Sequence, residues 1–130
     1  MNHFERLERL LDRAYAPYSR FRVAAVAVDS EGNLYEGVNV ESAAYPTTMC
    51  AERNAIFHAV AAGMAHGTVR EVHILARDGE GAFVPAYPCG ACRQIIAEQS
   101  SKDAEVFVYF SKERVERYTI AELLPHAFTL

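Results

Sequence analysis

The chain has 130 residues, of which 51% are hydrophobic and 23% charged, and its formal net charge is -4. This length fits one domain over residues 1–130, and the acidic balance leaves no positive surplus to neutralise a nucleic-acid backbone, so we expect a small-molecule or protein partner. No apolar run reaches the roughly 18 residues that cross a bilayer, and charges over 5–13 interrupt any leader, so we expect a cytoplasmic protein without a membrane segment.

Patterns in the first half of the chain predict a helix, a hairpin, a loop and a second helix. The first helix begins with a capping box and carries apolar residues on one face. Two runs of strand-forming residues joined by a turn-rich segment predict the hairpin. The second helix is alanine-rich and ends at a glycine. In order, these elements cover residues 2–15, 21–28 with 34–40, 41–49 and 50–62.

The second half alternates strands and helices. A third strand is followed by a loop with two glycines, a helix that starts just after a Pro-Cys pair, a fourth strand, a weaker fifth strand and a short capped helix that stops at a proline. In order, these cover residues 69–76, 77–86, 90–99, 104–110, 114–118 and 119–125. The alternation predicts an α/β fold of three layers, α-β-α, with a mixed five-stranded sheet and helices on both faces.

All three cysteines stand where a predicted helix begins. Cys50 opens one helix, and Cys89 and Cys92 bracket the first turn of another. Backbone N–H groups and the helix dipole stabilise thiolate at such places, and thiolate is the form that binds metal. The spacing of Cys89 and Cys92 suits a zinc site, and Cys50 completes three ligands if the two helix starts lie side by side. Three protein ligands leave a fourth position for water, as in catalytic zinc sites.

A carboxylate and a guanidinium follow the first cysteine. Glu52 stands two residues after Cys50 at a helix start, so it can reach a water at the open position without binding the metal. Hydrolytic removal of an amine needs protons moved from water to a ring nitrogen and to the leaving amine, and Glu52 is the expected proton shuttle. Arg53 is the expected donor to the ligand sulfurs, because three thiolates around a divalent ion leave a negative charge to offset.

Two simpler interpretations of the cysteines stay open at this point. A redox pair formed by the Cys-x-x-Cys cysteines would leave Cys50 and Glu52 without a role. A closed structural zinc site would need a fourth ligand, which His58 or His73 supplies only if the fold brings it close. No histidine has ligand spacing to a cysteine, so we assign the histidines no role.

Five stretches of the chain match, in order, the motifs of one enzyme family. With a Cys ligand, one residue, a Glu and a later Pro-Cys-x-x-Cys, the chain resembles the homotetrameric, zinc-dependent cytidine deaminases over nearly its whole length. The resemblance implies a cytidine-deaminase-like fold and the hydrolysis of cytidine and 2'-deoxycytidine to uridine and 2'-deoxyuridine with release of ammonia, a step of pyrimidine salvage. The stretches are Ala16-Pro17-Tyr18-Ser19-Arg20-Phe21-Arg22-Val23, Asn39-Val40-Glu41-Ser42-Ala43-Ala44-Tyr45, Cys50-Ala51-Glu52-Arg53, Pro88-Cys89-Gly90-Ala91-Cys92-Arg93-Gln94 and Glu122-Leu123-Leu124-Pro125-His126-Ala127-Phe128.

The resemblance also implies roles for single residues. For the reaction it implies one Zn²⁺ per chain, a proton shuttle and a donor to the thiolates, carried by Cys50, Cys89 and Cys92, by Glu52 and by Arg53. For the nucleoside it implies Asn39 and Glu41 on the ribose hydroxyls, Phe21 beside the nucleoside and backbone groups around Ala51 on the base. Without the resemblance, Asn39 and Glu41 would be solvated residues at a strand end, and Phe21 a core residue.

Related enzymes act on other cytosine compounds, and the first ligand favours a free nucleoside. By resemblance, a cysteine at the place of Cys50 goes with free-nucleoside enzymes, and a histidine with most nucleotide, base and nucleic-acid deaminases. A deaminase of a modified nucleoside such as blasticidin S, and a zinc-stabilised nucleoside-binding module without turnover, are the alternatives. Ala24 and Tyr87 replace a usual glycine and a common serine, and the 77–86 loop is long; of these, Tyr87 adjoins the site and bears on substrate choice.

An oligomer is expected from two apolar features. The helix over 51–62 is apolar nearly all round, which usually marks an interface, and the tail over 125–130 ends with two large apolar groups. In the resembling family, a tail phenylalanine at the place of Phe128 reaches the pocket of an adjacent subunit and covers the base. The alternative is that Phe128 packs on its own subunit. We expect a homotetramer.

Overall fold

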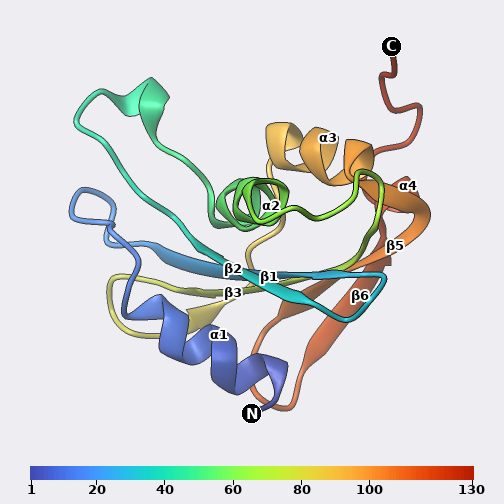
Figure 1. Ribbon diagram of the computed structural model, residues 1–130. Helices are drawn as coiled ribbons and strands as arrows, with labels where there is room; N and C mark the ends of the chain where they lie inside the picture. Colours follow the sequence, from blue (N-terminus) through green and yellow to red (C-terminus); the bar gives the residue numbers. More distant parts are fainter.

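A mixed six-stranded sheet runs through the computed structural model, which describes residues 1–130 (Figure 1). Five strands form a path in the order β2-β1-β3-β5-β6, and β4 pairs with the end of β3. The pair β3 and β5 is parallel, and the other pairs are antiparallel. The strands are β1 Arg22–Asp29, β2 Leu34–Val38, β3 Val69–Arg77, β4 Phe83–Val84, β5 Ser100–Tyr109 and β6 Val115–Thr119.

Helices cover both faces of this sheet, so the molecule has three layers (Figure 1). On one face lies α1 His3–Leu11, whose apolar side packs on alternate residues of β1, including Ala24 and Val26. The other alternate residues, Ala25 and Ala27, face the cluster under the remaining helices. The predicted α-β-α arrangement is therefore confirmed. The helices of the second face are α2 Ala51–Ala61, α3 Gly90–Glu98 and α4 Ile120–Leu123.

Four elements differ from the prediction. Helix α1 ends at Leu11 instead of continuing to Tyr15, because the Tyr15 backbone pairs with the chain after β2. Strand β5 begins at Ser100, four residues before the apolar run that predicted it. The loop predicted over 77–86 contains the two-residue strand β4, and the loop over 41–49 contains a single 3-10 turn, η1 Tyr45–Thr47. None of these differences changes the order of the main strands.

Gly37 lets α2 lie directly against β2. A Cβ atom at this position would overlap backbone atoms of Ala51 and Ala55. Any other residue would therefore push the first turns of α2 away from the sheet. The position of the α2 start, where Cys50 stands, thus depends on a residue with no side chain.

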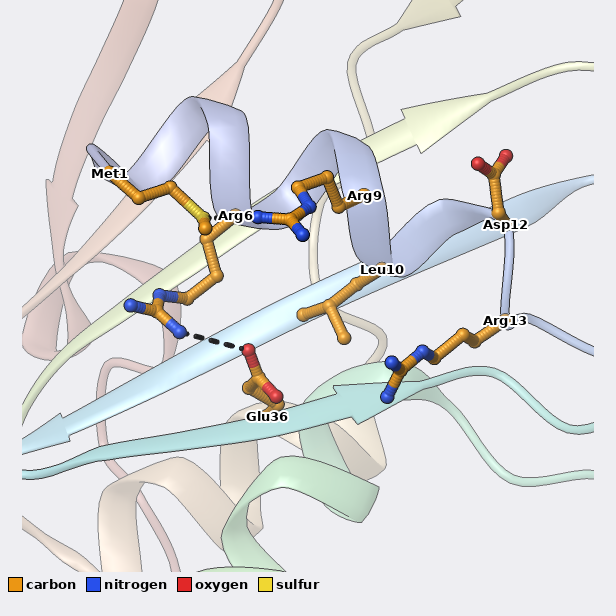
Figure 2. A pocket seen from close by; sticks show the side chains of 7 residues that line it. All are labelled: Met1, Arg6, Arg9, Leu10, Asp12, Arg13 and Glu36. Carbon is orange, nitrogen blue, oxygen red and sulfur yellow. Dashed lines mark hydrogen bonds and ion pairs between the residues drawn. The ribbon is translucent and has the colours of Figure 1, made fainter.

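Figure 2 shows a hollow between α1 and β2, on the opposite face of the sheet from α2. Arg6, Arg9 and Arg13 line it, but Arg6 Nη1 lies 3.2 Å from Glu36 Oε2, and Asp12 adds a second carboxylate. The hollow therefore carries little net charge and lies away from the cysteines. None of the helices is long and apolar enough to cross a membrane.

Candidate active site

The three thiol groups meet where α2 and α3 begin. Cys50 is the N-cap of α2, Cys89 is the N-cap of α3, and Cys92 lies in the first turn of α3. The Sγ atoms of Cys50 and Cys89 are 3.8 Å apart, and those of Cys89 and Cys92 are 3.3 Å apart. All three sulfurs lie within 4.8 Å of one another. The two helix starts are therefore side by side, which a shared ligand requires.

These sulfurs share negative charge unequally. The pKa of the Cys50 thiol is lowered to about 5, because its thiolate accepts a hydrogen bond from Cys92 and another from Arg53. The pKa of Cys92 is raised, because its thiol donates to Cys50 and because it is buried near the Glu52 carboxyl group. Cys50 therefore ionises readily, whereas the negative charge on Cys50 opposes the ionisation of Cys92. A divalent cation would favour full ionisation, and three close thiolates suit one zinc ion.

Arg53 stands beside the sulfurs in the first turn of α2. Its Nη2 donates to Cys50 Sγ at 3.4 Å, and this hydrogen bond raises the pKa of the guanidinium. Its Nε is buried and has no hydrogen-bond partner. Buried donors of this kind are uncommon and point to a group that binds at the site or to strain. The structure brings Arg53 to the sulfur with which the sequence analysis paired it.

Glu52 is buried next to the thiols, with 5% of its surface exposed. Burial raises its pKa to about 7, and the charge on Cys50 acts in the same direction. Its carboxylate is not part of the cluster of possible metal ligands, which contains the three cysteines alone. A carboxyl group with a pKa near neutrality can both accept and release a proton in one reaction cycle.

Asn39 and Glu41 are tied to the chain that leads into α2. They flank Val40, whose N–H donates to the Met49 carbonyl at 3.0 Å and whose carbonyl accepts from the Met49 N–H at 2.9 Å. Met49 directly precedes Cys50. Because side chains alternate along an extended segment, those of Asn39 and Glu41 lie on the same side of it.

Asn39 is buried, so its interpretation as a solvated strand-end residue is wrong. Its Nδ2 donates to the Phe21 carbonyl at 2.8 Å, and its Oδ1 accepts from the Val23 N–H at 2.9 Å. The amide retains a second N–H and a second lone pair. Asn39 therefore holds the chain before β1 and still has groups for a ligand.

The carboxylate of Glu41 accepts hydrogen bonds from the turn that precedes Phe21. Its Oε1 accepts from the backbone N–H groups of Tyr18 and Ser19 at 2.9 and 3.1 Å, and its other oxygen accepts from the Ser19 hydroxyl. The Ser19 hydroxyl bond is the largest cause that lowers the pKa of Glu41. The group is thus a fixed carboxylate with unused lone pairs.

The other three expected substrate residues are placed differently. Phe21 is half-buried, and Ala51 is fully buried as the first residue of α2. Phe128 is 67% exposed, and its carbonyl accepts from Gln94 Nε2 at 3.0 Å. Its neighbours include Ala97 near the C-terminal end of α3, whereas the thiols lie at the N-terminal end. The structure does not bring Phe128 to the thiols of its own chain.

Three polar residues that the sequence analysis gave no role hold the site together. Ser19 supports Glu41, and Asn54 Nδ2 of α2 donates to the Val38 carbonyl at 2.8 Å. Arg93 of α3 donates from Nε to the Pro88 carbonyl at 2.7 Å. Ser19 and Arg93 stand inside stretches that match the family motifs, and this match could have pointed to a role for them. Asn54 had no signal in the sequence beyond its place after Arg53.

The histidines do not complete a closed zinc site. His58 Nδ1 lies 3.2 Å from the Glu36 carbonyl, and His73 lies on the α1 face of the sheet. His73 forms a second cluster with His3 and Glu71. Both ring nitrogens of His73 have partners there, and its ring stacks on that of His3 with centroids 3.8 Å apart. Stacked rings cannot both direct lone pairs at one ion, so this cluster does not suit a metal in the observed conformation.

Comparison with known proteins identifies the family. Residues 2–109 match the family model for the cytidine and deoxycytidylate deaminase zinc-binding region. The chain belongs to the cytidine and deoxycytidylate deaminases. Cytidine deaminases of Sporosarcina psychrophila and Halalkalibacterium halodurans are 44% and 40% identical to it, over 91% and 89% of this chain and 82% and 83% of theirs.

Solved structures of this deaminase family share the fold. Cytidine deaminase from Burkholderia pseudomallei matches with a TM-score of 0.86 and 37% identity, over 98% of this chain and 100% of that chain. Cytidine deaminase from Mycobacterium tuberculosis matches with a TM-score of 0.73 and 29% identity, over 100% of both chains. Because the matched family region binds zinc and contains all three cysteines, the redox-pair interpretation is set aside.

Proposed function

We propose that this deaminase hydrolyses the exocyclic amine of cytidine and 2'-deoxycytidine, giving uridine or 2'-deoxyuridine and ammonia. Cys50, Cys89 and Cys92 would hold one zinc ion per chain. The observation that carries the proposal is a trio of thiols at two helix starts with the buried carboxyl group of Glu52 beside it, in a chain of this family. The proposal places the enzyme in the cytoplasm, acting on free nucleosides and not on nucleic acid.

Glu52 carries the protons of this reaction. Bound zinc would supply a water acidic enough to attack at neutral pH. Glu52 is placed to accept one proton of the attacking water and to deliver it to the ring nitrogen next to the amine-bearing carbon. It would then transfer the second proton of that water to the amine, which would leave as ammonia when the carbon–nitrogen bond breaks. Its pKa of about 7 suits both transfers.

Asn39, Glu41, Phe21 and Ala51 would orient the nucleoside. A fixed carboxylate at Glu41 is suited to accept hydrogen bonds from vicinal sugar hydroxyls, and the spare N–H of Asn39 is suited to donate one. Phe21 would pack beside the nucleoside, and the backbone around Ala51 would bind the base. A fixed negative charge at Glu41 also disfavours a phosphate on the sugar.

We further propose that the enzyme is a homotetramer whose sites are completed between subunits. Helix α2 buries one side against the sheet but exposes 43% of Phe57 and 39% of Val60 on the other. The chain ends beyond α3 (Figure 1), and Phe128, close to this end, is 67% exposed although its carbonyl accepts a hydrogen bond from Gln94 of α3. An apolar helix face and an exposed phenylalanine near the chain end are features that a partner subunit would cover.

An ammonia-release assay on the purified chain tests this proposal directly. Cytidine and 2'-deoxycytidine should be deaminated far faster than cytosine, deoxycytidine monophosphate or single-stranded DNA, and elemental analysis should find one zinc per chain. Faster turnover of a modified nucleoside such as blasticidin S would identify that nucleoside, and not cytidine, as the preferred substrate. Zinc and nucleoside binding without ammonia release would identify a binding module instead.

A further inference from the structure

The four residues 85–88 connect β4 to the first residue of the Cys-x-x-Cys pair. They form neither helix nor strand, and both Pro85 and Pro88 lack a backbone N–H. Pro88 is fully buried and Ala86 packs against the core, and two side-chain hydrogen bonds also hold the segment. Arg93 Nε donates to the Pro88 carbonyl at 2.7 Å, and the Tyr87 hydroxyl donates to Glu116 Oε1 at 3.1 Å. The first bond comes from α3 itself, so Tyr87 provides the bond that fastens the segment to the sheet.

Glu116 of β6, which accepts the Tyr87 hydrogen bond, is already held in place by two neighbouring side chains. The Tyr118 hydroxyl donates to the same Oε1 at 2.6 Å, and Arg114 Nη2 lies 3.3 Å from Oε2. The Tyr118 bond is the largest cause that lowers the pKa of Glu116, so the carboxylate stays charged. The rings of Tyr87 and Tyr118 also meet edge to face, with centroids 6.0 Å apart. Tyr87 therefore docks on a group that its neighbours already fix.

Cys89 is the thiol nearest in sequence to this docking, and it is also held as the N-cap of α3 by a bond from the Cys92 N–H to its sulfur. Cys92 is buried within α3, and Cys50 follows the backbone pair between Val40 and Met49. Cys89 is exposed and comes two residues after Tyr87. A displacement of residues 85–88 would move its sulfur relative to the other two.

We propose that Tyr87 is a positioning residue that holds Cys89 in the zinc site through its hydrogen bond to Glu116. The inference rests on the proposed function, because it takes the three thiols as zinc ligands. Loss of the hydroxyl keeps all three cysteines in the chain but removes the bond that fastens the segment before Cys89 to β6. Outer groups that orient zinc ligands typically change metal affinity by about 10- to 100-fold, and a tether two residues away from a ligand is expected to have a smaller effect.

Zinc transfer from the loaded protein to a coloured chelator measures this effect. Tyr87→Phe, which removes only the hydroxyl, should release zinc about 3- to 10-fold faster than the unaltered chain. Any deaminase activity that this variant loses together with its zinc should return when Zn²⁺ is added in excess. Glu116→Ala should behave in the same way, and the double variant should release zinc no faster than either single variant, because both changes break one bond.

Tyr35→Phe is the matched control. The Tyr35 hydroxyl donates to Asp29 Oδ2 at 3.2 Å, so the same kind of bond is lost at the hairpin end of β1 and β2. This variant should release zinc at the unaltered rate. A zinc-loaded Tyr87→Phe or Glu116→Ala variant that also does so would overturn the tether and leave the proposed function standing. An unaltered chain that holds no zinc would overturn both.

Discussion

At the residue scale, Glu52 and Arg53 show how one helical turn supplies both a cationic donor to a sulfur and a carboxyl group with a raised pKa. Consecutive residues of a helix point about 100° apart, so the two side chains leave α2 in different directions. Arg53 donates to the Cys50 sulfur, whereas Glu52 is buried where the sulfur charge raises its pKa. The guanidinium stabilises thiolate, and the carboxyl group stays available for protons. The sulfur and the carboxyl group, two residues apart, therefore lie in different environments, as the proposed roles of zinc ligand and proton carrier require.

Glu52→Gln separates these roles. The amide has nearly the same shape but cannot carry the protons, so deaminase turnover should fall by about 100- to 10,000-fold. Zinc content should stay at one ion per chain, because the substituted group is not a ligand. Kinetics and elemental analysis on the same preparation measure both. Loss of zinc would make Glu52 a ligand, and near-normal turnover would remove it from the mechanism.

The residues of this site differ in how far the sequence predicts them. Cys50, Glu52 and Cys89 stand in contiguous motifs, and their spacing relative to a helix start is what predicted their roles. The hydrogen bond from Ser19 to Glu41 joins residues 22 positions apart, and no local sequence pattern predicts it. The tether from Tyr87 spans 29 positions in the same way. The meeting of the three cysteines was therefore predictable from local motifs, whereas the long-range contacts around them required the fold.

At the element scale, the hairpin of β1 and β2 turns around a buried carboxylate. Burial alone would raise the pKa of Asp29, but hydrogen bonds from the Asn33 side chain and backbone, from the Glu31 N–H and from the Tyr35 hydroxyl together lower it. A pKa that is lower in the folded chain than in the unfolded chain stabilises the fold above the unfolded pKa of about 3.9. That contribution is lost as the pH falls through the folded value.

Asp29→Ala should therefore lower stability in a pH-dependent way. At pH 7 the melting temperature should fall by about 2–6 °C, because several hydrogen bonds to a charged acceptor are lost. As the pH falls below the unfolded pKa of about 3.9, the gap to the unaltered chain should narrow, because Asp29 becomes protonated in that chain. Thermal unfolding followed by circular dichroism from about pH 2 to pH 7 checks this. A gap that stays constant across that range would contradict it.

Helix α2 depends on the missing side chain at Gly37. Because a Cβ atom there overlaps the backbone of Ala51 and Ala55, Gly37→Ala should cost about 1–3 kcal/mol of stability and shift the start of α2. Denaturant unfolding and zinc content measure the two effects. In Gly90→Ala, also near a helix start, the added Cβ meets nothing within 4 Å, so its free energy of unfolding should be nearly unchanged. Equal free energies of unfolding for the two variants would refute the close contact.

The elements themselves were predictable where their patterns are long. The apolar face of α1 and the strands β1 and β3 carry enough periodic residues to be recognised from the sequence. Strand β4 has two residues, too few for any period, and it forms because β3 extends past β5 and offers it a pairing edge. The start of β5 is polar, so its extent is decided by backbone pairing and not by side chains.

At the scale of the whole molecule, several large apolar side chains are exposed on the surface of the chain. Phe57 and Val60 stand out from α2, and Tyr45 of η1 is 74% exposed. The loop that carries η1 and the C-terminal tail extend on the same side of the sheet as α2 and α3 (Figure 1). This side also carries the thiols, so subunits that pack against it would lie close to the active site.

The proposed role of Phe128 is tested first in a single variant. Phe128→Ala should weaken substrate binding, seen as a higher KM, because the base loses an aromatic cover. Zinc content should not change, since the tail does not contact the thiols of its own chain. Sedimentation should show tetramers without substantial monomer at assay concentration. A fully active monomer would overturn the tetramer, and an unchanged KM would remove Phe128 from the site.

Mixed tetramers then decide which subunit supplies the phenylalanine. Glu52→Gln subunits have a defective site but an intact tail, and Phe128→Ala subunits have the reverse. If the tail acts on the neighbouring subunit, dissociating and reassociating the two variants together should give tetramers with part of the low-KM activity, because intact tails then cover intact sites. If the tail acts on its own subunit, every intact site keeps its defective cover and KM stays high. Phe128→Ala mixed with unaltered subunits provides the calibration, because its proportion of low-KM sites follows from random assembly.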